Sequence, residues 1–239
     1  MYVDVHCHLS DFKNKDIDKF LQSGIEIVAV SDDIDTSLKT LELSKKYEKI
    51  IPCIGIHPWN IKDANIKDIF RINKIISKED IRCLGEIGLD RRFIPEIWDL
   101  QLKFFKGFLE IAKEYDVVMN IHSPKASRDV YELLLKYDIN KAIFHWYNGP
   151  IELIDKLQEN DFLISINPAI QIQKKHRKIV EYTNIKNIVT ESDGPYKYRS
   201  LFLNPLLIPD VVDQISQIKN MNRKIVREKI WQNYKNIFR

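Results

Sequence analysis

The sequence predicts a single-domain (β/α)8 TIM barrel of the α/β class, and three observations lead to this prediction. Eight short apolar runs rich in Val and Ile recur along the chain, at intervals of about 30 residues, which is typical of βα units around a parallel sheet. The segments between these runs have the periodicity of amphipathic helices. The length of 239 residues is close to the size of about 250 residues that eight such units need.

The strands are expected where the apolar runs lie. In chain order they span residues 2–6, 25–30, 51–57, 81–87, 117–122, 142–145, 162–166 and 187–191. An open doubly wound sheet is the alternative fold, but it usually has fewer strands and often a glycine-rich first turn. The chain contains neither G-x-G-x-x-G nor G-x-x-x-x-G-K-[ST], and this absence favours the barrel.

The intervening helices are expected to pack one apolar face on the strands. The face between the fourth and fifth strands consists of Trp98, Leu102, Phe105, Leu109 and Ala112. After the eighth strand we expect a helix from about residue 204 and a last amphipathic helix over residues 222–236, with Ile225, Ile230 and Tyr234 packed against the barrel. No linker or Pro/Ser-rich boundary interrupts this pattern, so residues 1–239 are expected to form one domain.

The composition is that of an ordinary globular protein. The chain is 44% hydrophobic and 30% charged with a net charge of +3, which excludes a disordered tail. Cys7, Cys53 and Cys83 are an odd number without a C-x-x-C pair, which excludes a disulfide-rich scaffold and favours a reducing compartment. No apolar run reaches the roughly 18 residues of a membrane span, and the first strand leaves no room for a signal peptide. We therefore expect a cytoplasmic protein without a membrane partner.

Five of the six histidines fall at or just beyond the carboxyl ends of expected strands. His6, His57, His122 and His145 end the first, third, fifth and sixth strands, and His8 follows His6 by two positions. In a parallel barrel these ends form one rim, where the loops of successive strands converge on a common pocket. Three acids are expected at the same rim: Glu86, Glu191 and Asp193.

These side chains have the chemistry of a divalent-metal site. His6 and His8 are two positions apart in an extended segment, so both imidazoles point to the same side and can reach one cation, while Cys7 points the other way. Imidazole nitrogens with carboxylate oxygens suit zinc, manganese or similar divalent ions, and a Glu carboxylate can bridge two ions. The five histidines and three acids together predict a metal site rather than separate core residues.

Several segments of the chain resemble the TatD family in order and spacing. They are Asp4-Val-His6-Cys-His8, Gly55-Ile-His57-Pro58, Gly85-Glu86-Ile-Gly88-Leu-Asp90, Ile121-His122-Ser123, the strand that ends in His145, Glu191-Ser-Asp193-Gly-Pro195 and the closing Asn233 to Phe238. TatD proteins are metal-dependent hydrolases of the amidohydrolase-like barrel class, described mainly as deoxyribonucleases acting on DNA ends. Glu86 is the most specific element, because other branches often carry a carbamylated lysine at strand four.

The resemblance implies two divalent ions, Mg2+, Mn2+ or Zn2+, and a set of protein ligands for each ion. The first ion would be held by His6, His8, Glu86 and Asp193, and the second by Glu86, His122 and His145, with Glu86 bridging. Asp193 and Glu86 are then the expected catalytic residues, with Asp193 accepting the proton of an attacking water. The implied substrate is DNA. His57 is expected to face the scissile phosphate, and Glu191 either orients a ligand or joins a third ion.

The chain departs from the family pattern beside the site. Pro124 and Lys125 follow Ser123 where the family commonly has an arginine, so Lys125 is a candidate replacement for a phosphate-contacting cation. Arg91 and Arg92 add positive charge after the fourth strand. Trp146 and Tyr147 follow His145, where they either stack an unpaired base or pack the top of the barrel.

A basic run follows the seventh strand, at Lys174-Lys175-His176-Arg177-Lys178. Lys174 and Arg177 are candidate contacts to backbone phosphates, although such a run is often a solvated helix face. His176 belongs to this run and is not counted as a ligand.

Three functions stay open at this stage. The first is a metal-dependent deoxyribonuclease acting on single strands or DNA ends. The second keeps the metal chemistry for an ester or amide, such as an acylated tRNA or a small metabolite, because one barrel hosts many reactions. The third is a TatD-like subunit of a multi-protein, defence-type assembly. Nucleophilic catalysis is disfavoured, because the chain has no G-x-S-x-G elbow.

Overall fold

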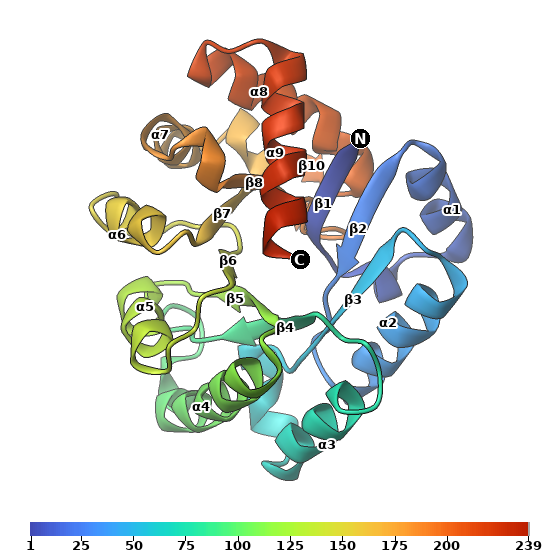
Figure 1. Cartoon of the computed structure of the whole chain (residues 1–239), viewed down its shortest axis with the longest axis vertical. Helices are drawn as coiled ribbons and strands as arrows, with labels where there is room; N and C mark the ends of the chain where they lie inside the picture. Colours follow the sequence, from blue (N-terminus) through green and yellow to red (C-terminus); the bar gives the residue numbers. More distant parts are fainter. Residues whose placement is uncertain (239) are drawn as a thin grey trace.

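A computed structural model describes residues 1–238 and confirms the (β/α)8 barrel. Eight parallel strands follow one another around the barrel in sequence order (Figure 1). They are β1 Tyr2–Cys7, β2 Ile25–Ala29, β3 Ile50–Ile54, β4 Cys83–Gly88, β5 Val118–His122, β6 Ala142–Phe144, β7 Leu163–Ile166 and β8 Ile188–Thr190. Each lies on a run where the sequence predicts a strand.

The helices surround the strands, as the outer ring in Figure 1 shows. They are α1 Asn14–Gln22, α2 Ile34–Lys46, α3 Lys67–Ile76, α4 Trp98–Tyr115, α5 Ser127–Lys136, α6 Leu153–Glu159, α7 Lys174–Tyr182, α8 Ile208–Lys219 and α9 Arg223–Ile237. The predicted apolar face of α4 packs on the core: Phe105, Leu109 and Ala112 are buried, and Trp98 and Leu102 are partly buried against it. The expected last helix is α9, which Asn222 caps by accepting from the Lys224 backbone N–H.

The barrel is closed between β8 and β1 by side-chain and loop hydrogen bonds. The Thr190 hydroxyl donates to the Val3 carbonyl at 2.6 Å, and the Asp193 backbone N–H donates to the His6 carbonyl at 2.9 Å. The buried Asp4 carboxylate accepts from the Ser192 backbone N–H at 2.8 Å. This seam holds the end of β8 against β1 and so sets the position of Asp193 beside the first histidines.

Helix α9 covers the amino ends of β8 and β1. It crosses in front of these strands in the view of Figure 1. On the inner face of α9, the side chains of Val226, Ile230 and Tyr234 are buried, whereas the side chain of Ile225 is 46% exposed. The prediction that Ile225 packs on the barrel is therefore wrong, because the inward face of this helix passes through its neighbour Val226.

Three features are additional to the expected elements. A short hairpin of β9 Lys197–Tyr198 and β10 Leu201–Phe202 follows β8. Six short 3-10 helices occur among the described residues: Leu9–Asp11, Pro58–Asp63, Pro95–Ile97, Pro168–Gln171, Ile185–Asn187 and Pro205–Leu207. The helix expected from about residue 204 therefore begins as a 3-10 turn before α8.

Cys53 and Cys83 form a disulfide between β3 and β4, and Cys7 is free and buried. The odd number of cysteines favours reduced side chains, so this disulfide differs from the expectation. The parallel register of β3 and β4 explains the bond, because Cys53 lies directly opposite Cys83. With one disulfide and a large apolar core, the fold is stabilised mainly by packing of the barrel and is not a disulfide-rich scaffold.

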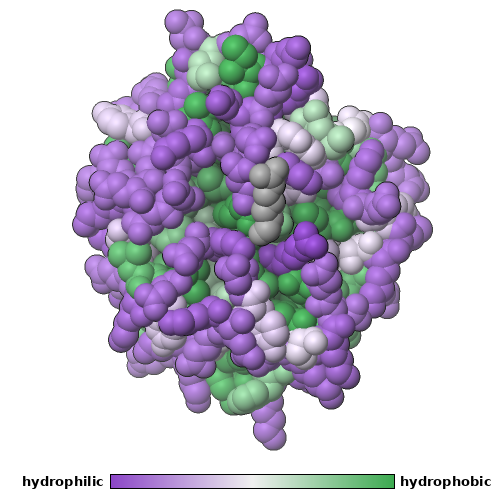
Figure 2. Space-filling model, in the orientation of Figure 1, coloured by the Kyte–Doolittle hydropathy of each residue, from purple (hydrophilic) through white to green (hydrophobic). Residues whose placement is uncertain are grey.

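The surface is mostly hydrophilic on the face that carries α9, with only scattered apolar groups (Figure 2). Among residues 1–238, no helix combines the length and the apolar character needed to cross a bilayer.

Candidate metal centre

The side chains predicted at the rim meet in one cavity at the carboxyl ends of the strands. His6 belongs to β1, Glu86 to β4 and His122 to β5, while His145 directly follows β6 and Asp193 lies beyond β8. All five are buried, with exposed fractions of 9% or less. The cavity has a volume of about 520 Å3, and most of the cluster lines it. Parallel strands bring these residues together from positions up to 187 apart in the sequence.

Glu86 is at the centre of the cluster. Its Oε2 lies 3.2 Å from His6 Nε2 and 3.3 Å from His8 Nε2. Its Oε1 faces the other side, at 2.7 Å from His122 Nδ1 and 3.8 Å from His145 Nε2. Burial would raise the pKa of this carboxyl, but the surrounding histidines hold it well below its ordinary value. Glu86 is therefore a carboxylate with one oxygen directed to each half of the cluster.

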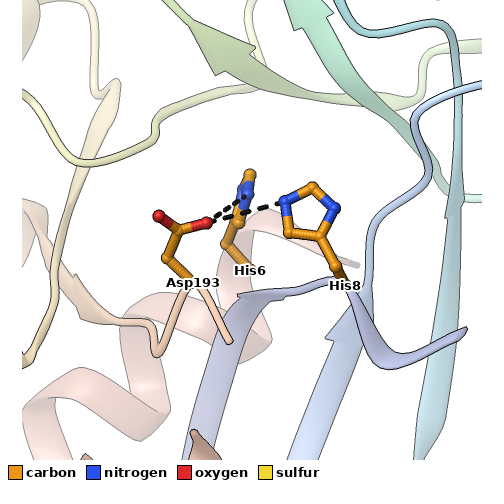
Figure 3. A group of neighbouring side chains, drawn as sticks. All are labelled: His6, His8 and Asp193. Carbon is orange, nitrogen blue, oxygen red and sulfur yellow. Dashed lines mark ion pairs between the residues drawn. The ribbon is translucent and has the colours of Figure 1, made fainter. Parts of the chain in front are cut away.

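Asp193 joins the half of the cluster formed by the first strand. Its Oδ1 lies 3.6 Å from His6 Nε2 and 3.5 Å from His8 Nε2, and its second oxygen points away from both rings (Figure 3). Burial acts to raise the pKa of Asp193, yet His145, His8 and His6 lower it overall. Its backbone is in the left-handed region, with φ of 55°, a strained conformation for a non-glycine residue. The β8–β1 seam holds Asp193 in this conformation.

Each of the four predicted histidine ligands has a polar partner on the nitrogen that faces away from Glu86. His6 Nδ1 lies 2.8 Å from Asn120 Oδ1, His8 Nδ1 3.2 Å from Asp32 Oδ2, His122 Nε2 2.9 Å from Asp90 Oδ2, and His145 Nδ1 2.9 Å from Glu191 Oε2. Because each partner is an oxygen acceptor, the outer nitrogen carries the proton in the neutral ring. The inner nitrogen then presents a lone pair to the cavity, which is the arrangement of metal-binding histidines.

His6 gives the sharpest test of whether a cation fits here. Its Nε2 is buried and has no hydrogen-bond partner among the described residues, although two carboxylates face it. A lone pair directed at carboxylate oxygens is repulsive unless a proton or a cation lies between them. The donor set of imidazole nitrogens and carboxylate oxygens is one that divalent transition ions prefer. The residues present therefore fit a bound divalent metal.

Without metal, the histidines would hold protons in place of the cation. Burial lowers the pKa of His6, but the charges of Glu86, Glu191 and Asp193 outweigh burial and raise it to about 9. The pKa of His122 is likewise about 9, because Asp90 and Glu86 outweigh its burial.

His57 lies in the same cavity but differs from the other four histidines in its hydrogen bonds. Its Nδ1 accepts from the Trp59 backbone N–H at 3.1 Å, so the neutral ring carries its proton on Nε2. That Nε2 lies 3.3 Å from Glu86 Oε1 and 3.3 Å from His122 Nδ1. Burial lowers the pKa of His57 and favours the neutral ring. In this tautomer His57 presents an N–H donor to the cavity, where the other four present lone pairs.

Four groups of neighbouring side chains could each hold an ion, and Asp32 enters one of them. The groups are His6–His8–Asp193, His6–Glu86–His145, His57–Glu86–His122 and His8–Asp32–Glu86. The second predicted site paired His122 with His145; here each of these histidines shares Glu86 with a different neighbour. Sequence reasoning missed Asp32, although it follows β2 at the same rim and precedes Asp33, whose carboxylate caps α2.

Asp90 is an acid that contacts a predicted ligand, His122, from the side away from Glu86. Asp90 is fully buried and accepts from the Trp59 indole N–H at 2.8 Å as well as contacting His122. Asp90 closes the Gly85–Asp90 segment that resembles the TatD family, but no local pattern predicted its contact with His122. Gly88, in the same segment, lies so close to β5 that a Cβ there would collide with the His122 carbonyl oxygen. This close contact between β4 and β5 places Asp90 within reach of His122.

Glu191 lies behind His145. Its Oε2 also accepts from the Ser165 hydroxyl, while Oε1 accepts from the Trp146 backbone N–H at 2.9 Å and the Asn167 amide at 3.4 Å. With four donors around it and no exposure to solvent, the carboxylate is positioned to orient the His145 ring. Of the two roles left open by the sequence, this geometry matches orientation of a ligand.

The residues predicted to contact substrate fall into two groups. Three of them line the cavity together with His57: Arg92, Lys125 and Trp146. Arg91, Tyr147, Lys174 and Arg177 do not line it. The Tyr147 side chain is fully buried and its hydroxyl donates to the Pro150 carbonyl at 2.6 Å, so this tyrosine packs the top of the barrel.

The three cations outside the cavity have other surroundings. Arg91 pairs with Asp129 and stacks on the Trp98 ring, with its guanidinium carbon 3.6 Å from the ring centroid. Arg177 donates to the Gln214 side chain at 2.9 Å, toward α8. Lys174 is exposed at the start of α7.

Comparisons with known proteins agree with this architecture. The family model described as "TatD related DNase" matches residues 3–239. An uncharacterized metal-dependent hydrolase of Methanocaldococcus jannaschii is 31% identical over 242 residues, covering 97% of this chain and 94% of that protein. The human deoxyribonuclease TATDN3 is 27% identical, covering 99% and 94%.

Among solved structures, the TatD homologue YJJV of Escherichia coli superimposes with a TM-score of 0.90 at 18% identity, over 99% of this chain and 97% of that one. This likeness shows the shared barrel fold. The family match extends over nearly the whole chain, and it includes every segment that supplies the clustered histidines and acids. The chain thus belongs to the TatD family of metal-dependent hydrolases.

Proposed function

We propose that this protein is a deoxyribonuclease that hydrolyses phosphodiester bonds at DNA ends or in single strands with the help of two divalent ions. The observation that carries the proposal is the buried His6 Nε2, which has no hydrogen-bond partner within residues 1–238 and faces the Glu86 and Asp193 carboxylates. Glu86 directs one oxygen to each half of the cluster, which suits a carboxylate shared by two ions. His6, His8 and Asp193 would hold one ion, and His122 and His145 would face the other.

Bound divalent ions would supply Lewis acidity, which lowers the pKa of a water and neutralises charge on a phosphate oxygen. The chain's own residues do the rest. Asp193 lines the cavity and keeps one carboxylate oxygen turned away from His6 and His8, where it can accept a proton from an attacking water. His57 presents its Nε2–H to the cavity and can donate to a phosphate oxygen. Asp90 and Glu191 hold the His122 and His145 rings in orientation.

A DNA substrate is supported by the walls of the cavity and by the relatives. Trp146 lines the cavity beside His145, with the ring centroids 6.3 Å apart, and makes T-shaped ring contacts with Tyr196 and Tyr198. Such exposed aromatic surface next to a metal centre suits stacking of an unpaired base, a contact worth about 1–3 kcal/mol per base. Two similar proteins, from human and Danio rerio, bear the name deoxyribonuclease or putative deoxyribonuclease.

The test is release of nucleotides from a 5′-labelled and a 3′-labelled single-stranded oligodeoxynucleotide by folded protein loaded in turn with Mg2+, Mn2+ or Zn2+. We expect turnover with at least one ion, abolished by EDTA and restored by adding the ion back. Absence of turnover with every ion, in protein whose metal content has been measured, would overturn the proposal. Faster hydrolysis of an aminoacyl ester or an amide than of any DNA would assign the same centre to the second function considered above.

Activity of the isolated chain also separates an enzyme from an assembly subunit. A subunit that depends on partners would be inactive alone and active in its complex. The cytoplasmic location expected from the sequence stays a prediction, and the fraction of Cys53–Cys83 disulfide in protein alkylated directly in lysed cells would test it.

A further inference from the structure

Three cationic side chains on one side of the cavity have no acidic partner. Arg92 and Lys125 line the cavity, and Lys175 donates to the backbone carbonyl of Asn148, which also lines it, at 2.6 Å. Within residues 1–238, no carboxylate lies within 4.0 Å of any of these three charges; their partners are the Asn148 carbonyl and, for Arg92, the face of Phe93 at 4.9 Å. All three residues are exposed to solvent.

Two arginines close to these cations in the chain do have acidic partners. Arg91 forms two hydrogen bonds with Asp129, and Arg128 pairs with Glu152 at 2.6 Å. The charges of Arg91 and Arg128 are thus balanced by carboxylates, whereas those of Arg92, Lys125 and Lys175 have no carboxylate within 4.0 Å among the described residues. Within residues 1–238, three cations without a carboxylate partner thus lie on or beside the wall of one cavity, and cations gathered at a cavity favour the binding of an anion.

The three cations come from different loops that the fold brings together. Arg92 follows β4 and Lys125 follows β5, and the two loops are joined by the Arg91 backbone N–H, which donates to the Pro124 carbonyl at 3.1 Å. Lys175 comes from the first turn of α7. Burial and the positive charge of Arg92 both lower the pKa of Lys175. Since Glu152, the acid that acts on Lys175, is already paired with Arg128, a bound anion would relieve this repulsion.

We propose that Arg92, Lys125 and Lys175 form a second phosphate subsite, which binds a phosphate of the substrate strand next to the one that is cleaved. This inference rests on the proposed function, because the metal centre is taken to hold the scissile phosphate. It specifies the substrate as a chain with at least two phosphates, an oligonucleotide rather than a mononucleotide or a carboxylic ester. Arg91, Lys174 and Arg177 lie outside this subsite.

Binding tests the subsite without relying on catalysis. The probe is a fluorescent, phosphorothioate-linked single-stranded oligodeoxynucleotide of twelve residues, titrated into Mn2+-loaded protein while anisotropy is followed from low to high salt. We expect Arg92→Gln and Lys175→Gln each to weaken binding several-fold and to reduce the slope of log K against log salt concentration by about 0.7, the value for one lost phosphate contact to a single strand. The matched controls Arg91→Gln and Lys174→Gln should retain the wild-type slope.

Hydrolysis provides the second readout. With the unmodified oligonucleotide, Arg92→Gln and Lys175→Gln should lower kcat/KM several-fold, through KM. With bis(p-nitrophenyl) phosphate, which has one phosphate, the loss in kcat/KM should be clearly smaller. Equal losses on both substrates, wild-type salt slopes in both variants, or equal effects of the Arg91 and Arg92 changes would each overturn the subsite.

The two proposals fail in different ways. Salt-dependent binding that needs Arg92 and Lys175, in a protein that cleaves no DNA, supports a DNA-phosphate site at these cations and refutes the nuclease. Cleavage of DNA that is indifferent to both substitutions supports the nuclease and refutes the subsite.

Discussion

The two ends of the barrel use the same eight strands for opposite purposes. At the carboxyl ends, buried histidines and acids face one another across a cavity, and His6 Nε2 lacks a hydrogen-bond partner among the described residues. At the amino ends of β1 and β8, helix α9 covers the barrel with Val226, Ile230 and Tyr234. There the Asn233 amide donates to the carbonyls of Ile185 and Ile188, at 2.7 and 2.8 Å.

The difference shows how the fold separates stability from chemistry. Polar groups at the covered end satisfy one another, and apolar side chains are removed from water, so this end stabilises the fold. The open end keeps like and unlike charges buried without full compensation, which costs stability unless a cation is bound. Changes at the open end should therefore alter activity in a folded protein, while changes beneath α9 should alter stability with the activity of the folded fraction unchanged.

The largest effect is expected at Glu86, which faces both halves of the cluster. Glu86→Gln removes the negative charge that the histidines surround, and we expect a loss in kcat of roughly a thousand-fold or more, the scale of removing a principal electrostatic element of an active site. Circular dichroism should show a retained fold. The exposed Glu159→Gln is the matched control and should keep full activity. Substantial turnover by Glu86→Gln would contradict the shared-carboxylate role.

The next effect tests the opposite end. Tyr234 lies on the inner face of α9 and is only 1% exposed. Tyr234→Ala should lower the free energy of unfolding by about 3–5 kcal/mol, as for other large aromatic deletions in cores. Ile225→Ala, on the exposed side of the same helix, should change it by less than about 0.5 kcal/mol. Denaturant titration measures both. If Tyr234→Ala lowered kcat of the folded fraction as strongly as it lowered stability, the separation of the two ends would not hold.

A smaller effect is expected behind the ligands. Glu191→Gln keeps the shape but weakens the acceptor for His145 Nδ1, and such changes typically cost about 10–100-fold in metal affinity or activity. Isothermal titration with Zn2+ or Mn2+ measures the affinity directly. A positioning role predicts that excess metal partly rescues activity in this variant and does not rescue Glu86→Gln. Unchanged affinity would show that Glu191 serves the fold alone.

The smallest effect concerns pH and metal removal. Folded-state pKa values of about 9 for His6 and His122 lie above the ordinary 6.5, so protonation stabilises the metal-free protein fully below pH 6.5, and this contribution is lost as the pH rises through 9. Metal binding displaces these protons and becomes more favourable over the same interval. The difference in Tm between Mn2+-loaded and EDTA-treated protein should thus widen from pH 6.5 to 9. A constant or narrowing difference would contradict the exchange of protons for metal.

Most of the fold was predictable because it depends on local periodicity. The eight apolar runs coincide with the eight barrel strands, and the apolar face from Trp98 to Ala112 lies on α4. The carboxyl ends of the strands could therefore be assigned to one rim, and this assignment predicts that His6, Glu86, His122 and Asp193 lie together. The hairpin of β9 and β10 was not predictable in this way, because strands of two residues leave no periodic signal.

The barrel and the set of histidines and acids at its rim were predictable from the amino-acid sequence, because the positions of the strands and the alternation of their side chains follow from short-range pattern. Which nitrogen of each histidine faces Glu86 depends on the folded structure, because the partners Asn120, Asp32, Asp90 and Glu191 come from other parts of the chain. The folded structure also separated Arg92, which lines the cavity, from Arg91, which pairs with Asp129. These distinctions arise from contacts between distant segments, and no local pattern encodes them.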